Sequence, residues 1–351
     1  SLCYKKLSMS KKNSNVILKE GFKNYKELLE IYSAFKKKLK LLKKKSFLVA
    51  VSGGPDSLAL TAMAKAYSYE NKCKVYYALI DHNIRNNSSK EALLVKKLLN
   101  EYKINLNILK NTKPIDRNIQ SQAREIRYNL LVAHCKKKKI KTILTAHNLE
   151  DQVETFFIRL SRGSGLQGLS SMNQVIKIKG NINLIRPLLD FKKKFLVDMS
   201  KIIFGKYFTD PSNKNTKYLR TRIRNLKKVL EASGINYDQI FKSIKNLASS
   251  RDTLDLYFNK IYNEVVNNKK DYTSIDLKKF NTLNQEMKIR VLSKSIKEFT
   301  KSYYSIRSKK IINLVSQIEK KENKESTLAG CLILKKKNYI VIKSRKKLDI
   351  Y

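Results

Sequence analysis

The sequence predicts an α/β protein in which a mainly parallel sheet precedes a smaller, mainly helical domain that ends in a β-hairpin. Three observations support this fold class. Between residues 45 and 189, short apolar runs alternate with amphipathic stretches, as in strand–helix–strand units with helices on both faces of a sheet. After residue 226 the pattern becomes that of helices. Residues 328–343 alternate as paired strands do, with residues 335–338 as the turn.

Each expected element follows from its apolar pattern. Four apolar runs predict strands at residues 46–51, 75–80, 104–109 and 142–145, and helical spacing predicts helices at residues 57–69, 89–102 and 119–135. Further along, we expect a strand at 182–189 and helices at 190–204, 223–232, 237–267, 284–299 and 309–320. Ligands of such sheets bind where the loops gather, at the carboxyl ends of the strands.

Length and composition divide the chain and limit its class. At 351 residues two domains are expected, and we place the parts at residues 1–44 (a basic helical extension), 45–225 and 226–351. The chain has no run of about 18 uncharged apolar residues, so we expect no membrane association. The polar, basic start is unlike a secretory signal. Four scattered cysteines favour a reduced, cytoplasmic protein over a zinc or iron–sulfur site.

The net charge of +46 favours a polyanionic partner. Lysine greatly outnumbers arginine, however, and an AT-rich coding sequence would produce the same surplus without a function. The arginines are more informative because their rigid fork of donors suits phosphate. Arg220, Arg222 and Arg224 fall within five positions, and Arg124, Arg127, Arg159, Arg162 and Arg186 precede them.

A candidate phosphate loop follows the first strand and opens a helix. Its sequence is Ser52-Gly53-Gly54-Pro55-Asp56-Ser57. Two glycines let backbone N–H groups turn inward, and the start of the helix adds positive dipole character. The two serine hydroxyls can donate to phosphate oxygens. Asp56 would repel a bare phosphate, so we expect Mg²⁺ to bridge its carboxylate to the phosphates. The alternative is an ordinary strand–turn–helix connection.

A pair of acids forms a second candidate site at the end of the fourth strand. Asp151 and Glu154 lie three residues apart at a helix start, so their carboxylates share one face. They could bind Mg²⁺ or hold an amine, or they could simply complement the helix dipole. His147, just before them, could equally be a satisfied residue at a strand end. The arginine groups could likewise be solvated helix faces.

Taken together, these motifs resemble a known family. The loop 52–57 matches the signature of the ATP-pyrophosphatase (PP-loop) superfamily, and the ordered set over residues 46–226 resembles tRNA(Ile)-lysidine synthetases. The set continues with Asp81-His82-Asn83-Ile84-Arg85, Ala123-Arg124-Glu125-Ile126-Arg127-Tyr128, Ala146-His147-Asn148-Leu149-Glu150-Asp151-Gln152-Val153-Glu154-Thr155, Arg162-Gly163-Ser164-Gly165-Leu166-Gln167-Gly168-Leu169, Arg186-Pro187-Leu188-Leu189, Asp210-Pro211-Ser212-Asn213 and Tyr218-Leu219-Arg220-Thr221-Arg222-Ile223-Arg224. Two positions depart from the family pattern: Asn148 stands for a second His, and Glu150 stands for an Asp.

The resemblance implies a fold, a reaction and partners. The fold would be a Rossmann-like sheet of the adenine-nucleotide α-hydrolase type, with residues 45–225 binding ATP and residues 226–351 binding tRNA. The enzyme would use ATP and Mg²⁺ to adenylate the cytidine at the first position of a CAU anticodon in tRNA(Ile). L-lysine would then displace AMP to give lysidine. The resemblance also allows a homodimer, since some relatives form dimers, although the sequence shows no interface signature.

The resemblance also implies roles for individual residues. ATP would contact the phosphate loop together with Asp81, Arg127 and His147, and Asp56 would hold the metal. Asp151 and Glu154 would bind the lysine amine and take its proton. Phosphates of tRNA would meet arginines, which are Arg85, Arg124, Arg162, Arg186, Arg220, Arg222 and Arg224. A PP-loop tRNA thiolase or an amidotransferase-type synthetase is the alternative, but sulfur transfer needs a cysteine pair or cluster.

Overall fold

The computed structural model describes residues 25–42, 46–84, 87–115, 119–209, 215–301, 306, 308–320 and 325–344. By backbone contacts the chain divides into two compact units, residues 1–247 and 248–351. Among the described residues, no helix is long and apolar enough to cross a membrane.

The first unit contains a six-stranded sheet in the order β3-β2-β1-β4-β6-β5. The parallel strands are β1 (Ser46–Val51), β2 (Lys74–Asp81), β3 (Leu106–Lys110), β4 (Thr142–Leu144) and β6 (Ile182–Ile185). The edge strand β5 (Val175–Ile178) pairs antiparallel with β6, and the apolar pattern missed it because its side chains are half exposed. The mainly parallel α/β sheet predicted from the sequence is confirmed.

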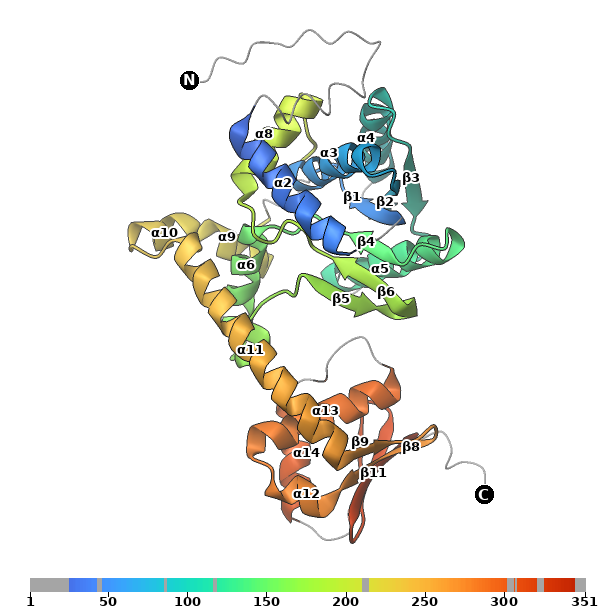
Figure 1. Ribbon diagram of the computed structural model, residues 1–351, viewed down its shortest axis with the longest axis vertical. Helices are drawn as coiled ribbons and strands as arrows, with labels where there is room; N and C mark the ends of the chain where they lie inside the picture. Colours follow the sequence, from blue (N-terminus) through green and yellow to red (C-terminus); the bar gives the residue numbers. More distant parts are fainter. Residues whose placement is uncertain are drawn as a thin grey trace. The chain divides into compact units, whose positions relative to one another are not determined.

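Helices cover both faces of this sheet (Figure 1). Right-handed crossovers put α3 (Pro55–Glu70) and α4 (Ser88–Glu101) on one face and α5 (Ile119–Lys137) on the other. The first face also carries α2 (Lys26–Leu41) and α8 (Lys193–Phe204), both of which contact α3. The rest of this unit includes α6 (Leu149–Leu160), α7 (Leu166–Leu169), α9 (Leu219–Asn225) and α10 (Lys227–Ala232), and α11 (Tyr237–Val265) begins in it.

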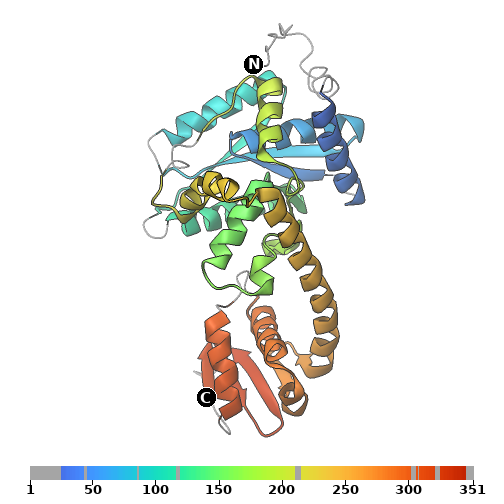
Figure 2. The ribbon, with the colours of Figure 1, turned by 90° about the vertical axis from the view of Figure 1, so that its left-hand side faces the viewer.

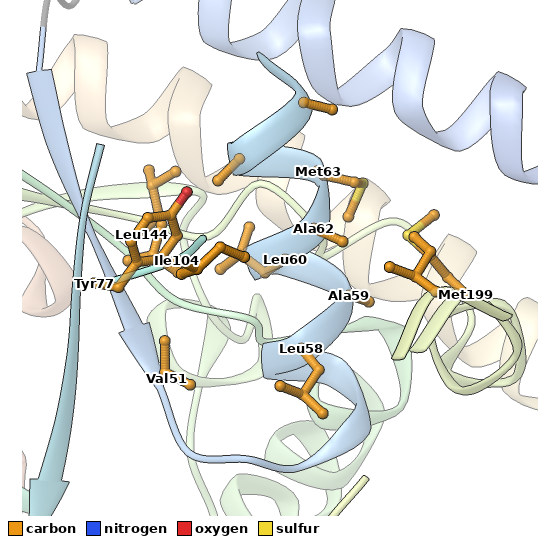
Figure 3. Packing of buried hydrophobic residues seen from close by; sticks show 14 of the residues in the cluster. Val51, Leu58, Ala59, Leu60, Ala62, Met63, Tyr77, Ile104, Leu144 and Met199 are labelled. Carbon is orange, nitrogen blue, oxygen red and sulfur yellow. The ribbon is translucent and has the colours of Figure 1, made fainter. Parts of the chain in front are cut away.

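The core of this unit centres on α3, which is buried on nearly all sides. Leu58, Leu60 and Met63 of α3 pack among side chains of the central strands and of α8 (Figure 3). An apolar, alanine-rich helix of this kind can only be stable when other elements surround it. The loop before it is therefore attached to one of the most firmly packed elements of the unit. The helix α2 also contributes buried residues to this core, including Phe35.

The second unit combines helices with a five-stranded antiparallel sheet in the order β7-β8-β11-β10-β9. The predicted hairpin is confirmed as β10 (Cys331–Lys335) and β11 (Tyr339–Ser344). The pattern missed its three partners, β7 (Val266–Asn268), β8 (Tyr272–Asp276) and β9 (Glu325–Leu328), which are short and polar. The helices α12 (Leu277–Thr282), α13 (Gln285–Thr300) and α14 (Ser308–Lys320) complete it; Figure 2 shows the elements from a second direction.

Candidate active site

The phosphate loop lies at the carboxyl end of β1, as the sequence predicts. Gly53 has a positive φ of 81°, and a Cβ there would lie 2.5 Å from Cγ2 of Val95. Only glycine fits this backbone and this space. Gly54 is the N-cap of α3, and Pro55 takes the first helical position, where its missing N–H is not needed.

Two serine hydroxyls close the loop on itself. The Ser57 hydroxyl accepts a hydrogen bond from the backbone N–H of Ser52 (3.1 Å) and donates to the carbonyl of Gly54 (2.9 Å). The two hydroxyls are 3.1 Å apart. From outside the loop, the Phe208 N–H donates to the Gly53 carbonyl (3.0 Å). The loop is thus held in a turn whose backbone is fixed before any ligand binds.

Asp56 is the one acid of the loop, and it is incompletely paired. Its Oδ1 is buried without a hydrogen-bond partner, while Oδ2 lies 3.5 Å from the Lys193 ammonium. Burial raises the pKa of Asp56 to about 6, against the opposing effect of Lys193, and the negative charge of Asp151 raises it further. The carboxylate is therefore placed in an environment that favours an added cation.

The acid pair, Asp151 and Glu154 on α6, is held by two arginines of α9. Arg220 donates from Nε to Glu154 (2.6 Å) and from an Nη to Asp151 (2.7 Å). Arg224 donates to both oxygens of Glu154, at 2.7 and 3.1 Å. Glu154 is only 2% exposed, and such a buried carboxylate requires this compensation. We call these four residues the acid–arginine cluster.

The two departures from the family pattern have local structural roles. Asn148 is the N-cap of α6: its side chain accepts from the Asp151 N–H (3.0 Å), while the Asp151 carboxylate accepts from the Asn148 N–H (3.1 Å). This reciprocal pair is a capping box. Glu150 accepts from the backbone N–H of Lys193 (2.8 Å) and so joins the start of α6 to the start of α8.

His147 lies at the end of β4, half-buried, with Nδ1 3.0 Å from the Thr145 hydroxyl. Its pKa lies well below the ordinary histidine value, first because of burial and then because of nearby positive charge. The charges come from four of the predicted arginines, which are Arg186, Arg124, Arg220 and Arg127. The structure thus brings residues from α5, the β6 end and α9 around one neutral imidazole.

Asp81, at the end of β2, is turned toward its own loop. Its carboxylate accepts from the Asn83 N–H (3.0 Å) and from the hydroxyls of Ser88 (2.8 Å) and Ser89. Burial alone would raise the pKa of Asp81, but these hydrogen bonds outweigh burial and lower it. The sequence predicts that Asp81 lies at a strand end, but it does not predict these hydrogen bonds to the residues that follow.

The remaining predicted arginines are distributed over several elements. Arg186 is buried and donates to the Asn173 carbonyl (2.7 Å). Arg162 is exposed in the turn after α6, and Arg222 is exposed on α9, where it donates to the carbonyls of Thr216 (3.4 Å) and Lys217 (3.3 Å). Arg85 and the motif 210–213 lie outside the described residues.

Sequence reasoning missed Lys193 as a member of this site. It lies in a run of three lysines, residues 192–194, of which only the middle one pairs with Asp56 among the described contacts. Helical spacing could have shown that the three point in different directions, but not which of them faces the loop.

A divalent cation beside the phosphate loop would have few protein ligands. Among the described residues, no group of three or more His, Cys, Asp or Glu side chains could hold a metal ion alone. Mg²⁺ normally takes one or two carboxylates and completes its shell with water and substrate phosphates. The unpartnered oxygen of Asp56 beside the phosphate loop fits that arrangement.

Comparison with known proteins identifies the family of this chain. A family model described as a PP-loop domain matches residues 26–230. The tRNA(Ile)-lysidine synthase of Wolbachia pipientis wMel is 36% identical over 299 residues, which cover 84% of this chain and 69% of the relative. That of Orientia tsutsugamushi (strain Boryong) is 33% identical over 328 residues, covering 91% and 73% respectively.

A solved structure shares the fold. The U34-tRNA thiolase NcsA from Methanococcus maripaludis superposes with a TM-score of 0.53 at 18% identity, covering 63% of this chain and 79% of that one. The family model and the two curated relatives show that the chain belongs to the PP-loop proteins and, among them, to the tRNA(Ile)-lysidine synthase family.

Proposed function

We propose that this protein joins L-lysine to the cytidine at the first position of the CAU anticodon of tRNA(Ile), using ATP, and forms lysidine, AMP and pyrophosphate. One observation carries the proposal: the phosphate loop and the acid pair belong to one electrostatic site. The negative charge of Asp151 raises the pKa of Asp56. The hydrogen bonds to Glu154 and the negative charges of both acids of the pair and of Asp56 raise the pKa of Arg224. A nucleotide at the loop therefore lies close to groups that can handle an amine.

The first step is adenylation of the base. The C2 carbonyl oxygen of cytidine attacks the α-phosphorus of ATP, and the bond to pyrophosphate breaks. The loop N–H groups and the hydroxyl of Ser52 orient the phosphates, while Ser57 holds the turn through its bond to the Gly54 carbonyl. When bound, Mg²⁺ would supply positive charge that offsets the charge of the departing pyrophosphate, and Asp56 is the residue that would hold it. Arg127, His147 and Asp81 lie at neighbouring strand ends or on α5, and we assign them to the ATP side of the site.

The second step needs a neutral amine. The ε-amine of lysine has an ordinary pKa of about 10.4 and must lose a proton before it attacks C2 and displaces AMP. Asp151 and Glu154 are the acids available to bind the ammonium and receive that proton. Both acids contact Arg220, so we assign the proton acceptance to the pair rather than to one of them.

The RNA side of the site is basic. The target base must leave its stack to reach the α-phosphorus. We assign RNA phosphate contacts to the arginines predicted from the sequence, of which Arg222 is exposed on α9 and Arg162 in the turn after α6. Activity on tRNA would place the protein in the cytoplasm, and a homodimer remains part of the proposal by family resemblance.

Sulfur transfer is the alternative that the fold would permit. The three described cysteines are all buried, and burial raises the pKa of each thiol, which disfavours the reactive thiolate. Cys73 lies at the amino end of β2, away from the strand ends that carry the loop. These observations favour lysine as the second substrate.

One assay tests the proposal. The protein is incubated with ATP, Mg²⁺, radiolabelled L-lysine and tRNA carrying a CAU anticodon. We expect lysine to enter the tRNA with release of pyrophosphate. Pyrophosphate release that depends on tRNA but leaves lysine free would contradict the proposed product, and tRNA binding without any turnover would contradict an enzymatic role.

A further inference from the structure

The acid–arginine cluster occupies the groups that would bind the lysine ammonium. Glu154 accepts three hydrogen bonds from guanidinium groups, one at Oε1 and two at Oε2. A carboxylate offers about four acceptor positions, so Glu154 is nearly saturated. Asp151 gives one oxygen to Arg220 and the other to the Asn148 N–H. A bound ammonium therefore competes with both guanidinium groups for the same carboxylate oxygens.

Charge leads to the same conclusion. The cluster holds two carboxylates and two guanidinium groups, so it is already balanced. A lysine ammonium would be a third cation against two acids, beside a carboxylate that is 2% exposed. Adding that charge to a partly dry site without removing another would be unfavourable.

The arginines differ from the acids in their access to solvent. The side chains of Arg220 and Arg224 are 38% and 37% exposed, whereas that of Glu154 is 2% exposed. More than a third of each arginine side chain is thus open to water, from which a phosphate could approach. Phosphate oxygens accept the same forked hydrogen bonds that a carboxylate accepts. An RNA backbone can therefore compete for the arginines, and the amine can replace them at the acids.

We propose that Arg220 and Arg224 act as an internal substitute for the substrate ammonium, and that RNA phosphates release the acid pair for lysine by drawing these arginines away. This inference rests on the proposed function and concerns the same site. Removing the arginines alone would leave Glu154 buried and unpaired, which is costly. RNA and lysine consequently assist each other, and thermodynamic linkage makes that assistance reciprocal. The amine is then held in place only when its RNA target is present.

The test measures lysine binding without chemistry. Radiolabelled L-lysine is equilibrated by dialysis against the whole protein, without ATP, in the absence and presence of saturating tRNA with a CAU anticodon. We expect tRNA to raise the affinity for lysine at least about fivefold, the lower end of usual coupling between sites. Equal affinity with and without tRNA, or no lysine binding in either condition, would overturn the proposal.

Two variants sharpen the test. In Arg224→Gln, Arg220 still pairs with Glu154, so we expect tighter lysine binding without tRNA and a smaller increase with it. Lys36→Gln is the matched control, because it removes the same charge from an ion pair with Glu70 (3.1 Å) that lies outside the site. In this control, the ratio of the lysine affinities with and without saturating tRNA should equal that of the unmodified protein. If Arg224→Gln leaves the ratio of the lysine affinities with and without tRNA unchanged, Arg224 does not compete with lysine for Glu154.

The two proposals fail differently. If lysine enters tRNA but its binding does not depend on tRNA, only the proposal that the arginines stand in for the substrate ammonium is overturned. Coupled binding without incorporation would overturn the proposed reaction and leave the coupling intact. The comparison on the unmodified protein needs no variant, so a variant that fails to fold does not weaken it.

Discussion

The phosphate loop and the acid–arginine cluster lie in the same unit but are prepared in opposite ways. The loop is fixed by its own backbone and hydroxyls, and its acid, Asp56, keeps one buried oxygen without a partner. In the cluster, both oxygens of Glu154 are bonded to arginines of the same chain. In the proposed reaction, the loop can receive a cation and phosphates as it stands, whereas the cluster must first give up a contact. The comparison separates an acid that keeps an unpartnered oxygen from an acid whose oxygens are already paired.

The largest effect should come from removing the free acid of the loop. Asp56→Ala should lower pyrophosphate release at least about a hundredfold, since a lost metal contact is worth several kcal/mol of transition-state stabilisation. Binding of tRNA, measured by filter retention, should stay nearly intact. If this variant loses tRNA binding, the loop belongs to the RNA-binding site and is not a separate site for the phosphates of ATP.

The preorganisation of the loop can be broken at Gly53. In Gly53→Ala the new Cβ meets Val95 at 2.5 Å while φ is 81°, so we expect a loss of about 2–4 kcal/mol in the free energy of unfolding. Urea denaturation measures it. Gly54→Ala is the matched control, because its Cβ meets Ser52 Oγ at 3.6 Å and its φ is −70°. Equal losses in the two variants would contradict the described turn.

Weakening the acid–arginine cluster should lower the free energy of unfolding. Glu154→Gln removes the charge that holds two arginines, and we expect a loss of about 1–3 kcal/mol, less than for a fully buried pair because both arginines are partly exposed. Glu231→Gln, in an exposed pair with Lys227 at 3.9 Å, should change stability by less than about 1 kcal/mol. Similar values for both would mean that the cluster contributes no more than a surface ion pair.

The smallest effect concerns His147, which lies among arginines near the cluster. Its depressed pKa means that it should stay neutral while a free histidine titrates near pH 6.5. The stability linked to it is present above pH 6.5 and is lost as pH falls, because the unfolded chain then takes up a proton that the folded chain does not. The chain has three histidines, so proton NMR can follow the ring of His147. A midpoint at or above 6.5 would contradict the basic surroundings.

Much of the site could be predicted from local sequence. A glycine pair between an apolar strand and a helix fixes the turn through backbone sterics, and the spacing of Asp151 and Glu154 fixes their common face. The partners of those acids could not be predicted, because Arg220 lies 66 positions beyond Glu154 and nothing local determines that α9 contacts α6. Glu150 departs from the family pattern, and only its hydrogen bond from the Lys193 N–H shows its structural role.

Local sequence is enough to predict the α/β order of elements, the phosphate loop and the family, because these depend on periodicity, turn chemistry and short motifs. The short strands β5, β7, β8 and β9 depend on the tertiary structure, since short polar strands are stabilised by their neighbours rather than by their own pattern. The pairing of the acids with Arg220 and Arg224 was also decided there, because burial of Glu154 demands counter-charges and only the packed fold determines which cations are within reach.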